Sequence, residues 1–214
     1  GIRYKKLPSI KEAEIYENAK NSFQYVTTTF INQLALAYPD TNVREMTKHL
    51  LRDVELNESH LSIGAGGYKM SSSVRHIIEG SKNPNFLTLL KEAHETNLST
   101  IIRYAEAVKK LGCGSAAILG LSVKGNQKNI ELSPSVILAE YLNKIGIKVY
   151  VDDPFYDKTS LSKILPFSRS MDILKDKFKA DALFVITDHN KYKYITQDDI
   201  NRLGIKNAAV IVDN

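Results

Sequence analysis

The sequence has a single cysteine, Cys113, among its 214 residues. One cysteine excludes an internal disulfide and any zinc site made of several cysteines, and it fits the reducing cytoplasm, where we expect the protein to be located. No apolar run approaches the roughly 20 residues that a membrane-spanning helix needs, and the first residues lack the pattern of a signal peptide, so no membrane partner is expected. An initiator methionine is also missing, and Gly1 suggests a chain that is processed, tagged or cut from a longer one.

Long runs of one charge are absent too, although the net charge is +5. A basic balance favours anionic partners such as nucleic acid, acidic lipids or phosphorylated small molecules. The tightest basic groups, at residues 3–6 and 175–179, are typical of solvated faces, so we do not expect a nucleic-acid partner. With 43% hydrophobic residues, the chain can bury a sizeable core without disulfides or metals.

Several motifs that would indicate a cofactor or a metal are missing. Residues 112–117 imitate the glycine-rich turn of a dinucleotide site, but that turn must follow a strand and open a helix, and here it follows a helix. We interpret it as a helix end, so no NAD site is expected in this chain. The five histidines have no metal-ligand spacing, and neither a P-loop nor a nucleophile elbow occurs, so no metal site is expected either.

The first half of the chain has the patterns of helices. Ser9 and Glu12 form a capping box, and apolar residues three or four apart continue to Ala37, until Pro39 ends the helix. The other expectations are a short helix over 41–51, an ordered loop over 57–73, one or two helical turns over 74–79 and a long helix over 84–111 that ends at Gly112. Asn97 interrupts the apolar stripe of the long helix. A buried amide costs stability unless its hydrogen bonds are made, so we expect Asn97 to have a specific partner.

The second half alternates between strands and helices. Short apolar runs predict buried strands at residues 116–121, 147–151, 182–187 and 208–212, and a helix is expected over 134–145. Strands separated by helices are typical of βαβ crossovers and a parallel sheet. We therefore expect an α + α/β protein. Residues 1–112 would form an all-helical domain in which the helix at about 84–111 is central, and residues 113–214 a small α/β domain.

Several segments of the chain match the motifs of one known family, in the same order and spacing. Residues 13–21 are similar to its helix A-E-x-x-K-x-x-x-N, and residues 64–73 to its loop G-x-G-G-x-C-x-P-K-D. Asn97 lies where the long central helix of that family carries an asparagine. The α/β half matches at residues 119–124, 129–134 and 153–154, which are similar to G-L-x-F-K, D-x-R-E-S-P and a D-P after the next strand. By these motifs the chain resembles the UDP-glucose/GDP-mannose dehydrogenase family.

The resemblance implies a subunit of three parts. These are an N-terminal Rossmann domain for NAD, a helical dimerisation domain, and a C-terminal Rossmann-like domain for the UDP group. Only the last two are expected here, so we expect a homodimer formed through residues 1–112 and a Rossmann-like domain of the UDP-sugar-binding type over residues 113–214. The reaction of the family is the NAD-dependent oxidation of a UDP-sugar to a UDP-uronic acid.

The catalytic positions of the family carry other side chains in this chain. The resemblance implies that the loop cysteine attacks an aldehyde made by a first hydride transfer, and that water opens the thioester formed by a second transfer. Lys69 stands in its place, and an amine can form only an imine, which does not lead on to a carboxylate. Glu17 replaces a lysine that stabilises negative charge on the reacting oxygen, and Ser73 replaces an aspartate that orients the water or the lysine. Asn129 and Glu131 replace the D and R of D-x-R. We therefore expect no catalysis.

What remains of the family pattern is a set of candidate substrate-binding residues. The set comprises Asn21, Gly64, Gly66, Gly67, Tyr68 and Lys124. Lys124 would meet a phosphate beyond the end of a strand, where parallel sheets bind ligands, and the glycines would let the backbone approach a sugar. Each residue also has an ordinary structural interpretation: a surface lysine for Lys124, a flexible turn for the glycines, and an interhelix hydrogen bond for Asn21.

Three hypotheses follow. The chain is the C-terminal part of a nucleotide-sugar dehydrogenase-like protein that has lost catalysis but keeps dimerisation and weak UDP-sugar binding. Alternatively, it belongs to a working but divergent dehydrogenase. The third hypothesis is a structural dimerisation module without a ligand.

Overall fold

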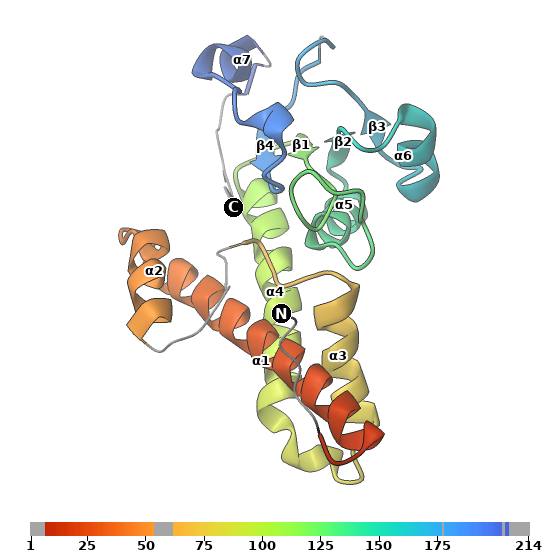
Figure 1. Cartoon of the computed structure of the whole chain (residues 1–214). Helices are drawn as coiled ribbons and strands as arrows, with labels where there is room; N and C mark the ends of the chain where they lie inside the picture. Colours follow the sequence, from red (N-terminus) through yellow and green to blue (C-terminus); the bar gives the residue numbers. More distant parts are fainter. Residues whose placement is uncertain (1–6, 54–61, 177, 203, 206–214) are drawn as a thin grey trace, which may run out of the picture.

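The computed structural model describes residues 7–53, 62–176, 178–202 and 204–205. These residues form a helical half and an α/β half, and the long helix α4, Thr88–Lys110, runs through both (Figure 1). The α + α/β class predicted from the sequence is confirmed. Within the described ranges, no helix combines the length and the apolar character that crossing a bilayer requires.

The helical half contains three further α-helices around α4. They are α1 Ile10–Ala37, α2 Val43–Asp53 and α3 Tyr68–Glu79, and the short 3₁₀ helix η1 Pro84–Phe86 precedes α4. The expected cap is present, since the side chain of Ser9 accepts a hydrogen bond from the N–H of Glu12 at 3.2 Å. Tyr25 of α1 is fully buried beside Val74 of α3 and Leu90 of α4, so a small apolar core holds these three helices together.

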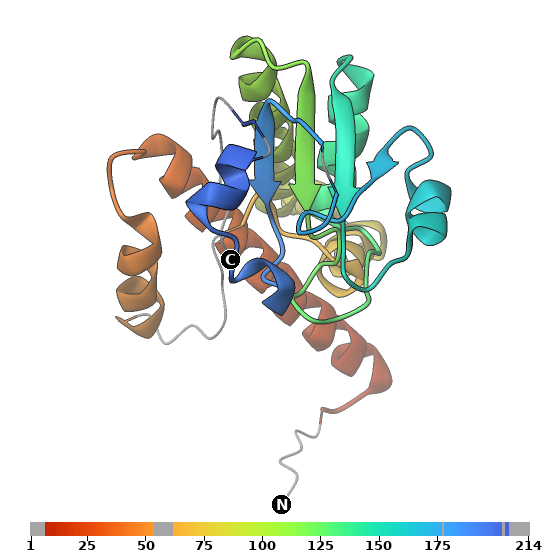
Figure 2. The ribbon, with the colours of Figure 1, turned by 90° about the horizontal axis from the view of Figure 1, so that it is seen from above.

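The α/β half is built around a parallel sheet. Its elements are β1 Ser115–Leu119, α5 Pro134–Lys144, β2 Lys148–Asp152, α6 Lys158–Ile164, β3 Arg169–Ser170, β4 Ala182–Val185, the 3₁₀ helix η2 Asn190–Tyr192 and α7 Gln197–Arg202. The strand order is β3-β2-β1-β4 (Figure 2). Ala117 of β1 lies opposite Tyr150 of β2 and Leu183 of β4, so β1 is a central strand with a parallel neighbour on each side.

Helix α4 packs in both halves of the molecule. Its residues Ile101, Ala105 and Val108 are fully buried and belong to the same core as Ile118 of β1 and Leu138 of α5. Figure 2 shows α4 and α5 together behind one face of the sheet. Because the spacing of three and four residues places these side chains on one face of the helix, α4 fixes the position of the sheet relative to α1 and α3.

Two predicted segments differ from the structure. The loop predicted over 57–73 was wrong at its end, because α3 begins at Tyr68. The first turns of α3 bury Ser72 and Ser73 instead of apolar side chains, so the sequence there has no helical periodicity. The helix predicted over 84–111 is divided at Leu87 into η1 and α4. The strand predicted over 208–212 lies outside the described residues, and α6, β3 and α7 were not predicted.

Asn97 has the specific partner that its position requires. Its Oδ1 accepts a hydrogen bond from the N–H of Ala65 at 2.6 Å, and its Nδ2 donates to the carbonyl of Ala65 at 2.9 Å. Both residues are buried. The prediction for Asn97 is confirmed, and the pair of bonds fixes the loop 62–67 against α4.

Candidate functional site

A cleft of about 710 Å³ lies between the helical half and the carboxyl end of the sheet. It is lined by α1, by the loop 62–67 with the start of α3, and by the loops that follow β1 and β4. The candidate residues in its lining are Asn21, Gly64, Gly66, Gly67, Tyr68, Lys69 and Lys124. Glu17 and Ser73 do not line the cleft, but each contacts a residue that does. Residues far apart in the sequence are thus brought to one place.

The cleft lies at the point where the order in which strands are added to the sheet reverses. The chain runs from β1 to β2 on one side, and β4 is added later on the other side of β1. The loops that leave the carboxyl ends of β1 and β4 supply Ser122, Lys124 and Thr187 to the lining. Open parallel sheets bind ligands in the crevice at such a point, because the two outgoing loops separate there.

The glycines of the loop 62–67 are close to other parts of the protein. A Cβ on Gly66 would lie 2.6 Å from Cγ of Pro134 and overlap the ring at Cδ. Gly67 has a φ of +88°, which favours glycine, and its N–H donates to the carbonyl of Leu132 at 3.0 Å. A Cβ on Gly64 would lie 2.8 Å from Ile101. Close packing against α4 at Gly64 and against the α/β half at Gly66 and Gly67 therefore accounts for all three glycines, while their backbone lines the cleft.

Glu17 and Lys69, which the motif comparison assigns to two altered catalytic positions, form an ion pair. Lys69 Nζ lies 3.1 Å from Glu17 Oε1, and Lys20 Nζ lies 2.5 Å from Glu17 Oε2. The hydrogen bonds from Lys20 and Lys69 lower the pKa of Glu17 to about 2, so its carboxylate is charged throughout the physiological range. The side chains of Glu17 and Lys69 are 46% and 68% exposed, so the pair adds only about 0–1 kcal/mol to stability. The ion pair mainly lowers the net charge of the site, because the carboxylate of Glu17 compensates the ammonium group of Lys69.

Asn21 is buried and bonded to α3. Its Nδ2 donates to Ser73 Oγ at 3.2 Å, and Ser73 Oγ donates to the carbonyl of Lys69 at 2.6 Å. This is the interhelix bond that the structural interpretation of Asn21 expects. The bond also joins α1 to the first turns of α3, where Lys69 is located.

Lys124 is exposed and lies on the loop that leaves β1. Among the residues that the structure describes, it has no ion-pair partner. The neighbouring carboxylate of the lining, Asp188, is 3.9 Å from Lys193. Lys124 is therefore a cation that is available to an anionic ligand in the cleft.

Other polar residues of the cleft were not singled out in the sequence. Gln24 and Thr28 line it together with Asn21, and their spacing of three and four residues, which puts them on one face of α1, was the available signal. Asn129 also lines the cleft, whereas Glu131 does not. No group of three or more potential metal ligands occurs in the ranges that the structure describes.

Buried polar residues behind the cleft hold the loop that carries Lys124. Oδ2 of Asp153 accepts hydrogen bonds from the N–H groups of Leu121 and Ser122 at 2.9 and 2.8 Å. Thr187 Oγ1 donates to the carbonyl of Ser122 at 2.6 Å. Asp153 belongs to a segment that had been matched to a family motif, and Thr187 to the end of a predicted strand, but their role as supports of this loop was not predicted.

Known proteins resemble the chain over most of its length. Residues 117–214 match the model for the UDP binding domain of the UDP-glucose/GDP-mannose dehydrogenase family. The UDP-N-acetyl-D-mannosamine dehydrogenase of Methanocaldococcus jannaschii is 26% identical over 212 residues, which cover 96% of this chain and 47% of that protein. The enzyme of the same name from Escherichia coli K12 is 24% identical over 215 residues, or 92% of this chain and 50% of that protein. The chain thus spans about half the length of these relatives.

Solved structures show the same fold. A UDP-glucose dehydrogenase from Pyrobaculum islandicum superimposes with a TM-score of 0.73 at 19% identity, over 86% of this chain and 45% of that one. A UDP-N-acetyl-mannosamine dehydrogenase from S. aureus superimposes with a TM-score of 0.72 at 21% identity, over 92% of this chain and 47% of that one. Residues 117–214 therefore match the UDP binding domain of the UDP-glucose/GDP-mannose dehydrogenase family, and the whole chain is similar to the C-terminal half of proteins that carry these dehydrogenase names, which confirms the resemblance found in its motifs.

Proposed function

We propose that this chain is the dimerisation and UDP-sugar-binding part of a cytoplasmic nucleotide-sugar dehydrogenase-like protein, and that it has lost the oxidation step. Residues 1–112 serve dimerisation and residues 113–214 bind the UDP group. The observation that carries the proposal is the cleft, which is lined by the glycine loop and Lys124 while Lys69 is paired with Glu17.

The size and chemistry of the cleft support a nucleotide-sugar ligand. Its volume of about 710 Å³ lies within the range of roughly 300–1,000 Å³ that is usual for small-molecule sites. Lys124 provides a positive charge for a phosphate, and the side chains of Gln24, Thr28 and Asn129 provide hydrogen-bonding groups for ribose and sugar hydroxyls. The similar proteins bear the names of UDP-sugar dehydrogenases.

The loss of oxidation follows from the residues at the altered positions. A thioester intermediate needs a thiolate, and the amine of Lys69 cannot replace it. Glu17 brings a negative charge to a place where the oxidation develops negative charge on oxygen, so it opposes the reaction. We also propose that these 214 residues hold no cofactor themselves, although the full-length enzymes of the family use NAD.

Weak binding of UDP-sugars is the first expected result. UDP-glucose should bind with a dissociation constant no better than high micromolar, because Glu17 compensates the charges of Lys20 and Lys69, which leaves Lys124 as the main attraction for the diphosphate. Lys124→Ala should weaken binding at least about fivefold, since one partly screened charge contact is worth on the order of 1 kcal/mol. Glu17→Lys should tighten binding by a similar factor. Titration calorimetry at millimolar ligand measures all three proteins.

Lys128→Ala is the matched control for the Lys124 variant. Lys128 is on the same loop and carries the same charge, but it lies over the ring of Tyr156 and does not line the cleft. Its loss should leave the affinity within about twofold, as expected for a screened surface charge. Absence of binding in every variant would show that the site is lost and would favour the structural dimerisation module.

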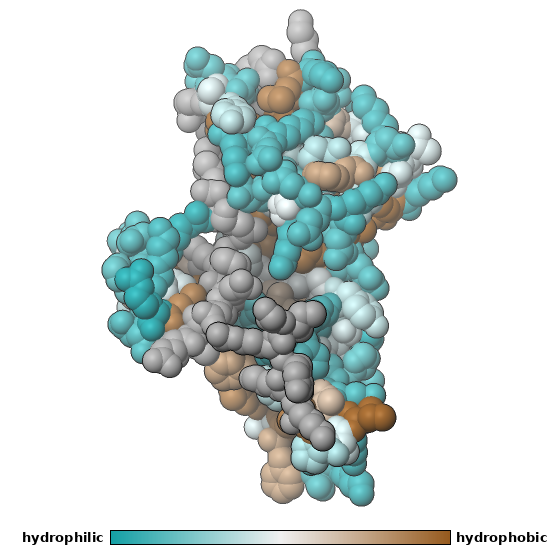
Figure 3. Space-filling view, in the orientation of Figure 1, coloured by the Kyte–Doolittle hydropathy of each residue, from teal (hydrophilic) through white to brown (hydrophobic). Residues whose placement is uncertain are grey.

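A homodimer is the second expected result. α1 exposes apolar side chains, and Phe23 and Phe30, seven residues apart on the same face, are 58% and 50% exposed. In Figure 3 brown and tan side chains gather toward the lower end of the helical half, whereas the α/β half above is mostly teal. Burying such a face needs an interface of about 1,600 Å² or more. Light scattering at micromolar concentration should give about 48 kDa, twice the 24.0 kDa of one chain.

The variants Phe23→Glu and Tyr194→Glu test this interface. A charge at Phe23 should shift the mass toward that of one chain, because a buried unpaired carboxylate opposes association. Tyr194 is 82% exposed but belongs to the α/β half, so Tyr194→Glu should leave the mass unchanged. A wild-type mass near 24 kDa would contradict the dimer.

A further inference from the structure

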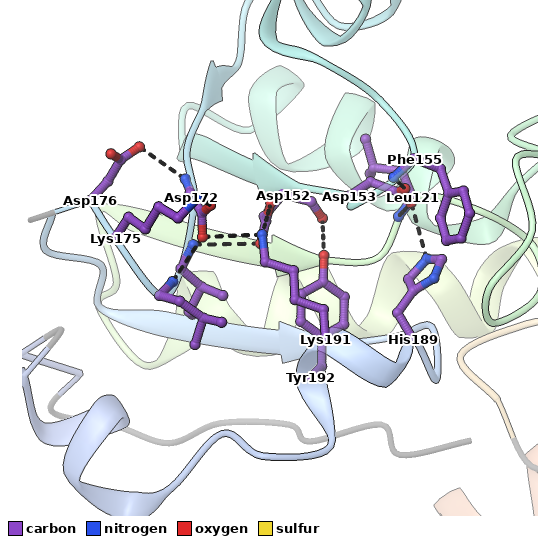
Figure 4. A network of polar contacts seen from close by, with 12 residues as sticks. Leu121, Asp152, Asp153, Phe155, Asp172, Lys175, Asp176, His189, Lys191 and Tyr192 are labelled. Carbon is purple, nitrogen blue, oxygen red and sulfur yellow. Dashed lines mark hydrogen bonds and ion pairs between the residues drawn. The ribbon is translucent and has the colours of Figure 1, made fainter.

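The loop that carries Lys124 is tied down on both sides of that residue. Where it leaves β1, the N–H groups of Leu121 and Ser122 donate to Asp153 Oδ2. Two residues after Lys124, the N–H of Asn126 donates to His189 Nδ1 at 3.0 Å. His189 Nε2 is in turn 3.3 Å from Asp153 Oδ2 (Figure 4). The buried contact between Asp153 and His189 therefore joins the two points that hold the loop before and after Lys124.

The direction of these bonds fixes the proton on His189. A backbone N–H can only donate, so Nδ1, which faces Asn126, must be the nitrogen without a proton. Nε2 then carries the proton and donates it to Asp153. The side chain of His189 is fully buried, and with neutral imidazole both of its nitrogen atoms are satisfied.

The Lys124 loop is tightly packed against the segment that follows β4. A Cβ on Gly125 would overlap the carbonyl of Asp188. Asn126 has a φ of 57° and accepts the N–H of Asn190 on its Oδ1 at 3.0 Å. The ring of His189 is packed between Phe155 and Tyr192, at centroid distances of 5.3 and 5.6 Å. A change in one of these bonds must therefore move the loop itself.

We propose that His189 is a proton-sensitive clasp of the cleft: the neutral side chain holds the Lys124 loop in its ligand-binding position, and protonation of His189 releases the loop and weakens the binding of UDP-sugars. This role depends on the proposed function of the cleft. Protonation places a hydrogen on Nδ1, so that two donors face each other and the N–H of Asn126 loses its acceptor. Two facing N–H donors repel each other, and the ring of His189 is fully buried and packed in place, so the repulsion is relieved when the loop at Asn126 moves away.

The charged groups around His189 permit this protonation. Burial acts to raise the pKa of Asp153, but hydrogen bonds from His189 and from the N–H groups of Phe155 and Ser122 outweigh it and hold that pKa below its usual value. Asp153 is therefore an anion beside the imidazole at pH 5–8. Lys191, on the same segment, is paired with Asp152 at 2.7 Å and Asp172 at 3.1 Å.

The remaining titratable neighbours do not compete for this proton. Burial and the nearby carboxylates of Asp152 and Asp153 raise the pKa of Tyr192, which stays neutral and donates to the carbonyl of Asp152. Asp188, next to His189 in the chain, is at the surface beside Lys193.

Calorimetry with UDP-glucose at pH 7.5 and pH 5.5 tests the clasp. Both phosphates of UDP-glucose are diesters, so the ligand does not titrate in this range. Affinity should fall at least about fivefold at pH 5.5, since an equilibrium coupled to one proton can change by up to tenfold per pH unit. His189→Asn should abolish this change, because an amide oxygen can accept the N–H of Asn126 but takes up no proton. His76→Asn, at an exposed histidine of α3, should keep it. An unchanged wild-type affinity, or a pH effect that survives in His189→Asn, overturns the proposal.

Nuclear magnetic resonance of the ligand-free wild type supplies a second measurement. The nitrogen shifts of the His189 ring report its protonation, and the amide shift of Asn126 reports the clasp. The amide should shift with the same midpoint as the ring, and an amide that does not respond overturns the proposal even if a variant fails to fold. Absence of UDP-glucose binding at both pH values would instead refute the proposed function of the cleft, and the Asn126 amide would still decide whether the clasp exists.

Discussion

No NADH is expected when the chain is incubated with NAD and UDP-glucose or UDP-N-acetylmannosamine. Among its 214 residues there is no strand, glycine turn and helix of the dinucleotide-binding kind, and Lys69 and Glu17 occupy the positions where the chemistry needs a thiol and a cation. Lys69→Cys alone should not restore activity. Absorbance at 340 nm measures NADH directly, and a rate above the protein-free background would contradict the proposed loss of oxidation.

The charge of the altered site can be tested without a cofactor. Lys69→Cys introduces a thiol beside Glu17, and the negative charge there should raise the pKa of the thiol and keep it unreactive. Adding Glu17→Lys replaces that charge with a positive one. The double variant should react with iodoacetamide about tenfold faster at pH 7, because a shift of about one pKa unit changes the thiolate fraction by that factor. Native Cys113 is only 7% exposed and provides the slow background rate. Equal rates in the two variants would show that Glu17 does not act on position 69.

Gly66→Ala should destabilise the protein by about 3 kcal/mol. The added Cβ would overlap the ring of Pro134 and lie 3.0 Å from the carbonyl of Leu132, and neither can withdraw without moving the start of α5. Overpacking of this kind costs about 1–3 kcal/mol and more where the neighbour is rigid. For a chain of this length the melting temperature should fall by roughly 6–12 °C, as measured by circular dichroism.

Gly114→Ala is the matched control for this effect. The nearest atom to its added Cβ is a carboxylate oxygen of Asp181 at 3.7 Å, which is ordinary van der Waals contact. The N–H of Gly114 donates to that same carboxylate and is kept in the variant. A melting temperature that falls equally in both variants would show that the contact with Pro134 is not the cause.

Local signals in the sequence were sufficient for the helix and strand pattern. Ser9 and Pro39 bracket α1, and apolar runs identified β1, β2 and β4 to within two residues at each end. The start of α3 was missed because its stability comes from a distant partner: Ser73 is buried by its bond to Asn21, 52 residues away. Such a contact leaves no periodicity in the local sequence.

The candidate site was predictable to a similar extent. Family motifs placed the glycine loop and Lys124 in one binding region, and the structure brings them to one cleft. The ion pair between Glu17 and Lys69 could not be inferred from either residue alone, since it depends on how α1 crosses α3. Asp153 stood in a recognised motif and His189 did not, and only the directions of their hydrogen bonds reveal that they hold a loop.

The sharing of α4 means that the region recognised as a UDP binding domain is not an independent folding unit. That region begins at residue 117, whereas Ile101, Ala105 and Val108 cover one face of its sheet from the preceding helix. A fragment cut at the family boundary would expose this apolar face to water and would lose the wall of the cleft made by the loop 62–67. A fragment made to test the proposed ligand binding should therefore include α4 and the loop 62–67 as well as residues 117–214.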